Sequence, residues 1–179
     1  MTKKLISNLK QKRYNEYVLN HDKFTKEWSR RKDEVKVEIH INSLGFDRFQ
    51  RSTTCNYMSN QNAQLSRIFR LIDPTIEIIY VSPFKIPLEI LSYYIKMMDL
   101  MGIENVAERF HIVTPENSEF FQKNKMPLSD LLFYSPFAID RINYLIDGRF
   151  SYIFGGFPGI DDIRLALAIN SSFYTGNPI

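Results

Sequence analysis

The residues best suited to binding a ligand lie in loops expected to follow the strands of a parallel sheet, where α/β proteins hold their ligands. Four such loops are NSLGFDR, SPFKIP, TPENSEF and GGFPGIDD. Their hydroxyl, amide, amine and backbone N–H groups could hold a small polar molecule. The ligand-rim candidates are Ser82, Lys85, Thr114, Asn117, Gly155 and Gly156. None of the four loops contains GxxxxGK[ST] or GxGxxG, the patterns that hold nucleotide phosphates.

The segment GGFPGIDD comes nearest to a phosphate-binding loop, because it places glycines between a strand and a helix. A phosphate would be bound there by free backbone N–H groups and the positive end of the helix dipole. Asp161 and Asp162 occupy that end and would repel an anion. We interpret the two aspartates as helix-capping residues and the glycines as a source of turn geometry.

The junction EIIYVSPFKIPLEILSYYI runs from a buried strand into a helix and contains two prolines but no glycine. Pro83 and Pro87 have no N–H to donate, which disfavours phosphate binding. Proline also restricts the residue before it, so Ser82-Pro83 and Ile86-Pro87 predict a rigid strand exit and a defined helix start. Ser82 stays a ligand candidate, whereas Lys85 is more typical of a surface lysine.

Patterns for metal binding and nucleophilic catalysis are missing from the sequence. His21, His40 and His111 belong to no HxH, HxxxH or HExxH pattern. His40 and His111 fall within expected strands, where a hydrogen-bonded structural histidine is more common than a ligand or a base. Cys55, in STTCNYM, has no pattern that marks a nucleophile. We therefore predict no catalytic residue, no metal site and no cofactor held by this chain alone.

The elements that must position these loops alternate between strand and helix. Strand patterns are found in VKVEIHINSL, EIIYVS, RFHIVTP, FSYIFGG and SSFYTG. Helical spacing is found in NAQLSRIFRLIDP, PLEILSYYIKMMDLMG, PLSDLLFYSPFAIDRINYLIDG (divided at Pro136) and GIDDIRLALAIN. The polar stretch GFDRFQRSTTCNYMSNQ predicts a loop. This order predicts an α/β fold, with a mostly parallel sheet of about five strands and helices on both faces.

Size and composition limit the class of protein. A chain of 179 residues with 44% apolar residues is long enough for one domain with its own core. A single cysteine, Cys55, excludes a disulfide framework and fits a reducing compartment. No stretch approaches the roughly 20 apolar residues that span a bilayer, and the first residues lack a signal-peptide core. We expect a cytoplasmic protein.

The net charge of +3 is unevenly distributed, since residues 1–36 carry 11 − 5 = +6 and the rest 12 − 15 = −3. Residues 1–34 therefore predict a basic helical leader, ahead of a body formed by residues 35–179. Its aromatic face could lie against that body, a partner protein or an acidic polymer such as RNA. The partner-docking candidates are Tyr14, Tyr17, Phe24, Trp28, Arg30, Arg31 and Lys32. We favour contact between this aromatic face and protein. We also expect the body to fold without the leader.

Several segments together resemble pre-ATP-grasp domains. NAQLSRIFRLIDPTIEIIYVSPFKIPLEILSYYIKMM is similar to the stretch of that family in which a helix ends in Asp-Pro and a strand ends in a Val-Tyr-Val-Ser/Thr type of sequence. In the family, Pro-Ile-Pro then leads into a helix bearing Tyr-Tyr. The order of segments found in that family continues through HIVTPEN, PLSDLLFYSPFAIDRINYLI and YIFGGFPGIDDIRLALAINSSFYTGNP. The HIVTPEN and YIFGG versions are especially similar to those of the IQ motif-containing protein H family of eukaryotic proteins, which is associated with sperm and cilia. The resemblance covers roughly residues 35–179.

The resemblance implies a Rossmann-like three-layer domain of the kind that precedes an ATP-grasp module, in which ATP and magnesium are bound. The sequence stops about where that module would begin, and it contains no IQxxxRGxxxR pattern for calmodulin. The leading hypothesis is a non-catalytic assembly subunit, of the ciliary axoneme by resemblance, which binds other proteins and no membrane. One alternative is the substrate-binding half of an ATP-dependent carboxylate–amine ligase. A second is RNA binding through the leader.

Overall fold

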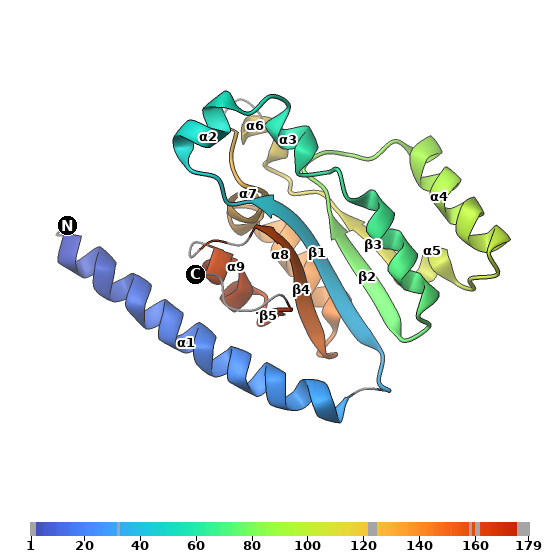
Figure 1. Ribbon diagram of the computed structural model, residues 1–179, viewed down its shortest axis with the longest axis horizontal. Coiled ribbons are helices and arrows are strands. Elements are labelled where there is room, and N and C mark those ends of the chain that lie inside the picture. Colours follow the sequence, from blue (N-terminus) through green and yellow to red (C-terminus); the bar gives the residue numbers. More distant parts are fainter. Residues whose placement is uncertain (1–2, 32, 122–124, 158, 160–161, 175–179) are drawn as a thin grey trace.

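The computed structural model describes residues 3–31, 33–121, 125–157, 159 and 162–174, and it contains one five-stranded sheet (Figure 1). The strands are β1 (Lys36–Leu44), β2 (Ile76–Val81), β3 (Phe110–Val113), β4 (Ser151–Phe157) and β5 (Ser172–Phe173). Their order is β3-β2-β1-β4-β5, and every pairing is parallel. The predicted α/β fold is confirmed.

Helices cover both faces of this sheet. They are α1 (Lys3–Arg30), α2 (Arg48–Thr53), α3 (Tyr57–Asn60), the 3₁₀ helix η1 (Leu65–Ile72), α4 (Leu88–Leu100), α5 (Val106–Arg109), α6 (Ser118–Phe121), α7 (Leu128–Phe133), α8 (Pro136–Ile146) and α9 (Ile163–Ala168). One hydrophobic core joins the sheet to α1, α7, α8 and α9, and a second joins it to η1, α4 and α5. The structure therefore has the three layers of a Rossmann-like domain.

Alternation along the central strands explains the two cores. Ile79 and Val81 of β2 lie in the first core, while Ile78 and Tyr80 lie in the second. Successive side chains of a strand point to opposite faces, so a strand buried on both sides has apolar residues at successive positions. The run IIYV, residues 78–81, fits this pattern.

Two segments differ from the sequence-based expectation. The polar stretch expected to be a loop contains α2 and α3, and α2 begins with a capping box. Asp47 accepts a hydrogen bond from the Gln50 N–H at 2.8 Å, and Gln50 accepts one from the Asp47 N–H at 3.0 Å. The segment expected to be an α-helix before β2 is the 3₁₀ helix η1. The expected break at Pro136 is present, as the first residue of α8.

The aromatic face of α1 packs on the body of the same chain. Tyr17 is 1% exposed, and its hydroxyl oxygen accepts a hydrogen bond from the Phe173 N–H at 3.2 Å. The rings of Phe24 and Phe150 stack at 5.4 Å, and Trp28 meets Tyr152 edge-on at 5.0 Å. The sequence left three surfaces open for this face: the body of the chain, a partner protein or an acidic polymer. In the structure the face packs on the body.

The beginning of α1 extends away from the sheet (Figure 1). Residues 6–13 are all exposed, and the first buried residue of the described part of the helix is Tyr17. We call residues 6–13 the α1 projection. No helix in the described part of the chain is both long and apolar enough to cross a membrane.

We expect Tyr17→Ala to lower the free energy of unfolding by about 3 kcal/mol, because it opens a cavity between α1 and the sheet. Leu19→Ala is the matched control, since Leu19 lies on the same helix but is 63% exposed. Chemical denaturation followed by circular dichroism measures both changes. Equal stability of the two variants would show that α1 does not pack on the sheet.

Candidate functional site

The order of the strands identifies one place where this fold can hold a ligand. Connections leave β1 and β4 in opposite directions, and ligands of open α/β sheets bind beyond the carboxyl ends of such strands. A cavity of about 320 Å³ lies there. Its lining comes from the loop after β1, the start of α7 and the loop before α9, and includes Asp47, Arg51, Ser129, Asp130 and Asp162. We call it the switch-point crevice.

Three carboxylates line the crevice, and each is engaged within the chain. Asp47 caps α2, and Asp130 accepts a hydrogen bond from Arg164 at 2.6 Å. Asp162 stands at the N-cap of α9 and accepts a hydrogen bond from the Gly159 N–H. Asp162 thus lies at the predicted N-cap position. Its carboxylate, however, binds the loop before α9 and makes no capping hydrogen bond to the described residues of the helix. Asp161 lies outside the described residues.

Polar groups under the crevice also bind one another. The hydroxyls of Ser43 and Ser129 are 2.9 Å apart, and both residues are buried. The buried Gln61 side-chain oxygen accepts hydrogen bonds from the Leu128 N–H at 2.7 Å and the Leu44 N–H at 3.2 Å. These bonds fasten the end of β1 to the start of α7, so the groups are used for structure. Among the described residues, no three histidine, cysteine or acidic side chains are grouped to hold a metal ion.

Gly156 has a steric role. A Cβ atom at this position would lie 2.8 Å from the Asn42 side-chain oxygen and would overlap the Ser43 carbonyl oxygen. Only glycine lets β4 approach β1 this closely. Gly155 and Gly156 belong to β4, as the strand pattern FSYIFGG predicted, and not to the turn of GGFPGIDD.

The other rim candidates are not brought into the crevice. Ser82 is fully buried, with its hydroxyl 2.5 Å from the Phe84 carbonyl oxygen. Asn117 donates a hydrogen bond to the Tyr134 carbonyl at 2.6 Å. Lys85 is exposed and Thr114 is half-buried, and they follow β2 and β3 rather than β1 and β4. The crevice is lined instead by Arg51 and other residues that the sequence did not single out.

A buried ionic cluster joins β1 and β4 to η1. Glu38 and His40 of β1 are both 0% exposed, and His40 Nε2 lies 2.8 Å from the Glu38 carboxylate. That carboxylate also accepts two hydrogen bonds from Arg70 and one from the Tyr152 hydroxyl, all at 2.5 Å. The guanidinium group of Arg70 covers the Phe154 ring at 4.7 Å. We call these residues the Glu38 cluster.

The protonation of the cluster follows from its contacts. Burial alone would raise the pKa of Glu38, but hydrogen bonds from His40, Arg70 and Tyr152 lower it to about 2. Burial lowers the pKa of His40, while Glu38 opposes this shift. A neutral His40 donates from Nε2, and its buried Nδ1 has no hydrogen-bond partner among the described residues. Because the carboxylate already accepts bonds from three side chains, we interpret the cluster as structural, as predicted for His40.

His111 also has the structural role that its strand position suggested. Its Nε2 atom lies 3.0 Å from the Glu77 carboxylate, which Arg149 binds through both terminal nitrogens at 2.6 and 2.9 Å. These contacts connect β3 and β2 to the segment between α8 and β4. Cys55, the single cysteine, is exposed.

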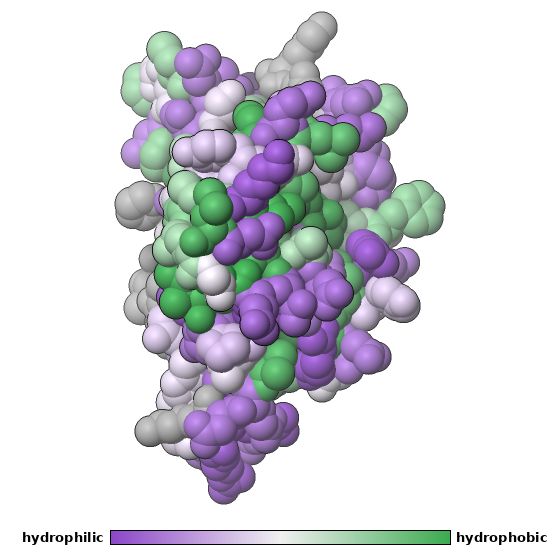
Figure 2. Space-filling view, turned by 90° about the vertical axis from the view of Figure 1, so that its right-hand side faces the viewer, coloured by the Kyte–Doolittle hydropathy of each residue, from purple (hydrophilic) through white to green (hydrophobic). Residues whose placement is uncertain are grey.

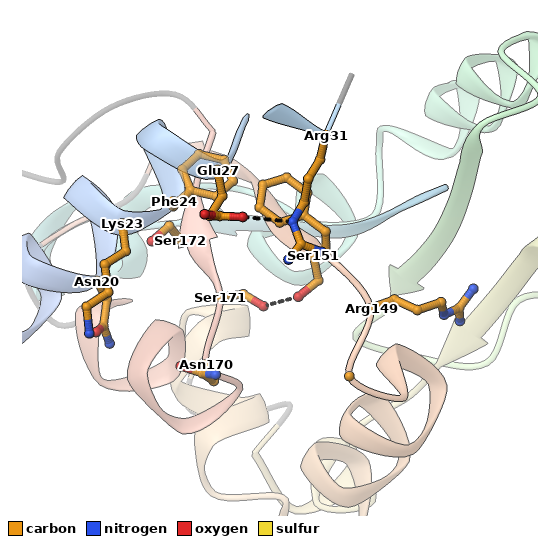
Figure 3. A pocket seen from close by; sticks show the side chains of 12 residues that line it. Asn20, Lys23, Phe24, Glu27, Arg31, Arg149, Ser151, Asn170, Ser171 and Ser172 are labelled. Atoms are coloured by element: carbon orange, nitrogen blue, oxygen red, sulfur yellow. Dashed lines mark hydrogen bonds and ion pairs between the residues drawn. The ribbon is translucent and has the colours of Figure 1, made fainter. Parts of the chain in front are cut away.

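A second cavity, of about 350 Å³, lies between α1 and the first residues of β4 and β5 (Figure 3). Two of the cations that line it are engaged elsewhere: Arg31 binds Glu27 at 2.9 Å and Glu34 at 3.2 Å, and Arg149 binds Glu77 and points away from the cavity. Arg30 also pairs with Glu27, at 3.2 Å. Lys32 lies outside the described residues. Two docking candidates, Arg30 and Arg31, are therefore in ion pairs within the chain.

We expect Glu38→Gln to destabilise the protein by about 2 kcal/mol at pH 7, because Arg70 and His40 lose a buried charged acceptor. The Glu38 pKa of about 2 lies below its ordinary value of 4.5. Its contribution is therefore complete above pH 4.5 and is lost as the pH falls through 2, so the two proteins converge in acid. Denaturation at several pH values tests this, with exposed Glu108→Gln as control; a pH-independent difference contradicts it.

We expect Gly156→Ala to cost about 2 kcal/mol of stability, because the added methyl group pushes β4 away from β1. Gly159→Ala is the control, since its Cβ would lie 3.7 Å from the nearest atom, in ordinary contact. Thermal unfolding compares the two variants. If both melt at the wild-type temperature, the strands are not held as close as the structure indicates.

Comparison with known proteins gives one informative relative. No family model matches the chain, and no solved structure matches it. IQ motif-containing protein H of Danio rerio is 33% identical over 149 residues, which cover 78% of this chain and 14% of that protein. The chain thus spans a small part of the length of the relative that it matches. The similarity to IQ motif-containing protein H indicated by HIVTPEN and YIFGG is confirmed over this stretch.

Proposed function

We propose that this chain forms a non-catalytic interaction domain, related to pre-ATP-grasp domains, that helps to build a larger assembly. The observation that carries the proposal is the charge of the side chains that line the switch-point crevice. Its lining contains the carboxylates of Asp47, Asp130 and Asp162 beside the cation of Arg51. A triphosphate would meet like charges there instead of the converging N–H groups that bind phosphate.

The relationship to pre-ATP-grasp domains is supported by the junction between β2 and α4. Pro87 is the N-cap of α4, and Ser82 is fixed by hydrogen bonds to Phe84 and Asn62. This rigid strand exit corresponds to the proline-containing junction of pre-ATP-grasp domains. In that family the domain supports a neighbouring module, so a shaped rim without chemistry of its own agrees with the proposed role.

The docking element that we propose is the α1 projection. Tyr17, Phe24 and Trp28 are used inside the chain, which leaves the first turns of the helix to meet a partner. Residues 6–13 contain three basic side chains and no acidic one. The resemblance to a family associated with cilia makes the axoneme the assembly that we propose.

A second candidate function is the substrate-binding half of a carboxylate–amine ligase completed by another chain. The acidic lining of the crevice favours it, because carboxylates attract a protonated amine. Calorimetry with a primary amine such as ethylamine separates the candidates: the assembly role predicts no heat of binding, and saturable binding would support the ligase. RNA binding through the leader stays a prediction, and a steep loss of affinity with salt would support it.

We expect Lys12→Glu/Arg13→Glu to reduce incorporation of the protein into its cellular assembly at least tenfold, because the charge of the α1 projection is reversed. Fractionation of the native cells and quantification of the tagged protein measure the effect. Thermal melting should be unchanged, because residues 12 and 13 are exposed.

Lys23→Glu/Lys26→Glu is the matched control. It makes the same change of charge on the same helix, at exposed residues beside the body. We expect this variant to be incorporated as the wild type is. Normal incorporation of the Lys12→Glu/Arg13→Glu variant would refute the docking role of the α1 projection.

A further inference from the structure

Helix α4 has a wider apolar surface than its own domain covers. A helix at the surface of a globular protein needs an apolar stripe of roughly 100° to face its core. Leu91, Tyr94, Ile95 and Met98 form that stripe and pack on the second core. A second apolar stripe lies beside it on the outward side of the helix. At 100° per residue, the two stripes together extend over about 220° of the helix.

The outward stripe has the spacing of a helix–helix seam. Its members are Ile90, Tyr93, Met97 and Leu100, separated by three, four and three residues. This is the spacing by which one helix packs along another. Ile90 is 45% exposed, Tyr93 63% and Leu100 89%. We call these four residues the α4 seam, and its spacing is compatible with packing against a second α-helix.

The α4 seam is part of an apolar patch in an acidic region. Figure 2 views the molecule from the side on which α4 and α5 lie, and it shows hydrophobic side chains gathered in the middle of this face with hydrophilic ones around them. Residues 88–109, from the start of α4 to the end of α5, contain four acidic side chains and two basic ones, a balance of 2 − 4 = −2. A helix that fits this surface must combine apolar residues with positive charge.

The α1 projection has these properties. Ile6 and Leu9 are 49% and 42% exposed. Ile6 precedes Phe24 by 18 residues, which is five turns, so it continues the face that packs on the sheet. Lys10, Lys12 and Arg13 give residues 6–13 a charge of +3. The α1 projection therefore carries an apolar face with a basic border, and this face extends beyond the body of the domain.

We propose that the α1 projection of one copy of this chain docks on the α4 seam of a second copy. The two surfaces are apolar, and their charges of +3 and −2 are complementary. They lie at opposite ends of the molecule (Figure 1), so each copy uses different surfaces toward its two neighbours. Such a heterologous contact adds copies in series. The inference rests on the proposed assembly function and names the partner as a second copy.

The contact has the properties of a weak interface. One short helix on one seam buries less than the roughly 1,200 Å² of a stable complex. Association should therefore appear only at high protein concentration and should weaken with added salt, because exposed charges contribute to it. Each added copy gains one such contact, so the length of the series should grow gradually with protein concentration.

Sedimentation velocity over a range of concentrations tests the proposal. We expect the mass of the wild-type protein to rise with concentration beyond that of a dimer. Lys12→Glu/Arg13→Glu disables the α1 projection, and Tyr93→Lys/Leu100→Lys disables the α4 seam. Each variant alone should be monomeric, with at least a tenfold loss of association. An equimolar mixture should form a dimer and nothing larger, because each variant keeps one intact surface that fits the other.

Phe137→Lys/Tyr144→Lys on α8 is the matched control, because these residues are 76% and 73% exposed and receive the same charge. It should associate as the wild type does, and circular dichroism should show all variants folded. The proposal is overturned if the wild type stays monomeric, if the mixture stays monomeric, or if the α8 control is equally impaired. A monomeric wild type, together with loss of the Lys12→Glu/Arg13→Glu variant from the cellular assembly, would leave the assembly role standing with a different partner.

Discussion

The structure depends on how β1 is buried on both of its faces. Val37, Ile39 and Ile41 point into one hydrophobic core, while Glu38 and His40 point to the opposite face. A buried carboxylate is tolerated only when its charge is neutralised and its oxygens are hydrogen-bonded. Arg70 and Tyr152 meet this requirement, so the need to satisfy one carboxylate fixes η1 and β4 against the central strand.

Polar groups under the crevice are also hydrogen-bonded within the chain. The end of β1 is fastened to α7 through Ser43 and Gln61, and Gly156 permits β4 to approach it. These bonds make a rigid floor, and they leave carboxylates rather than N–H groups along the walls. Exposed apolar side chains lie elsewhere, and those of the α1 projection and the α4 seam are among them. The proposed function therefore rests on outer surfaces, where a partner would gain most by covering them.

Much of the fold could be predicted from local patterns. The apolar runs identified the strands, and Pro136 marked the division between α7 and α8. The polar segment after β1 was expected to be a loop because its helices are too short for a periodic signal. The Asp47 to Gln50 spacing of a capping box was the one signal that could have revealed α2. The aromatic periodicity of α1 indicated a buried face, but periodicity does not say which surface covers it.

The site was harder to predict, because its contacts connect residues far apart in the sequence. Glu38 and His40 share a face in VKVEIHINSL, but their partners Arg70 and Tyr152 lie 32 and 114 residues from Glu38. The crevice likewise combines three separate loops. The sequence offered loop positions after strands as candidates. Which of those loops meet depends on the strand order, and the sequence does not state that order.

Amine-reactive cross-linking of the native assembly, followed by mass spectrometry, tests the central claim most directly. If the outer surfaces carry the function, Lys12 of the α1 projection and Lys96, beside the α4 seam, should cross-link to other polypeptides. Lys125 contacts the loop that contains α2, and it should react only within its own chain. Intermolecular links concentrated at Lys125, with none at Lys12 or Lys96, would contradict the account.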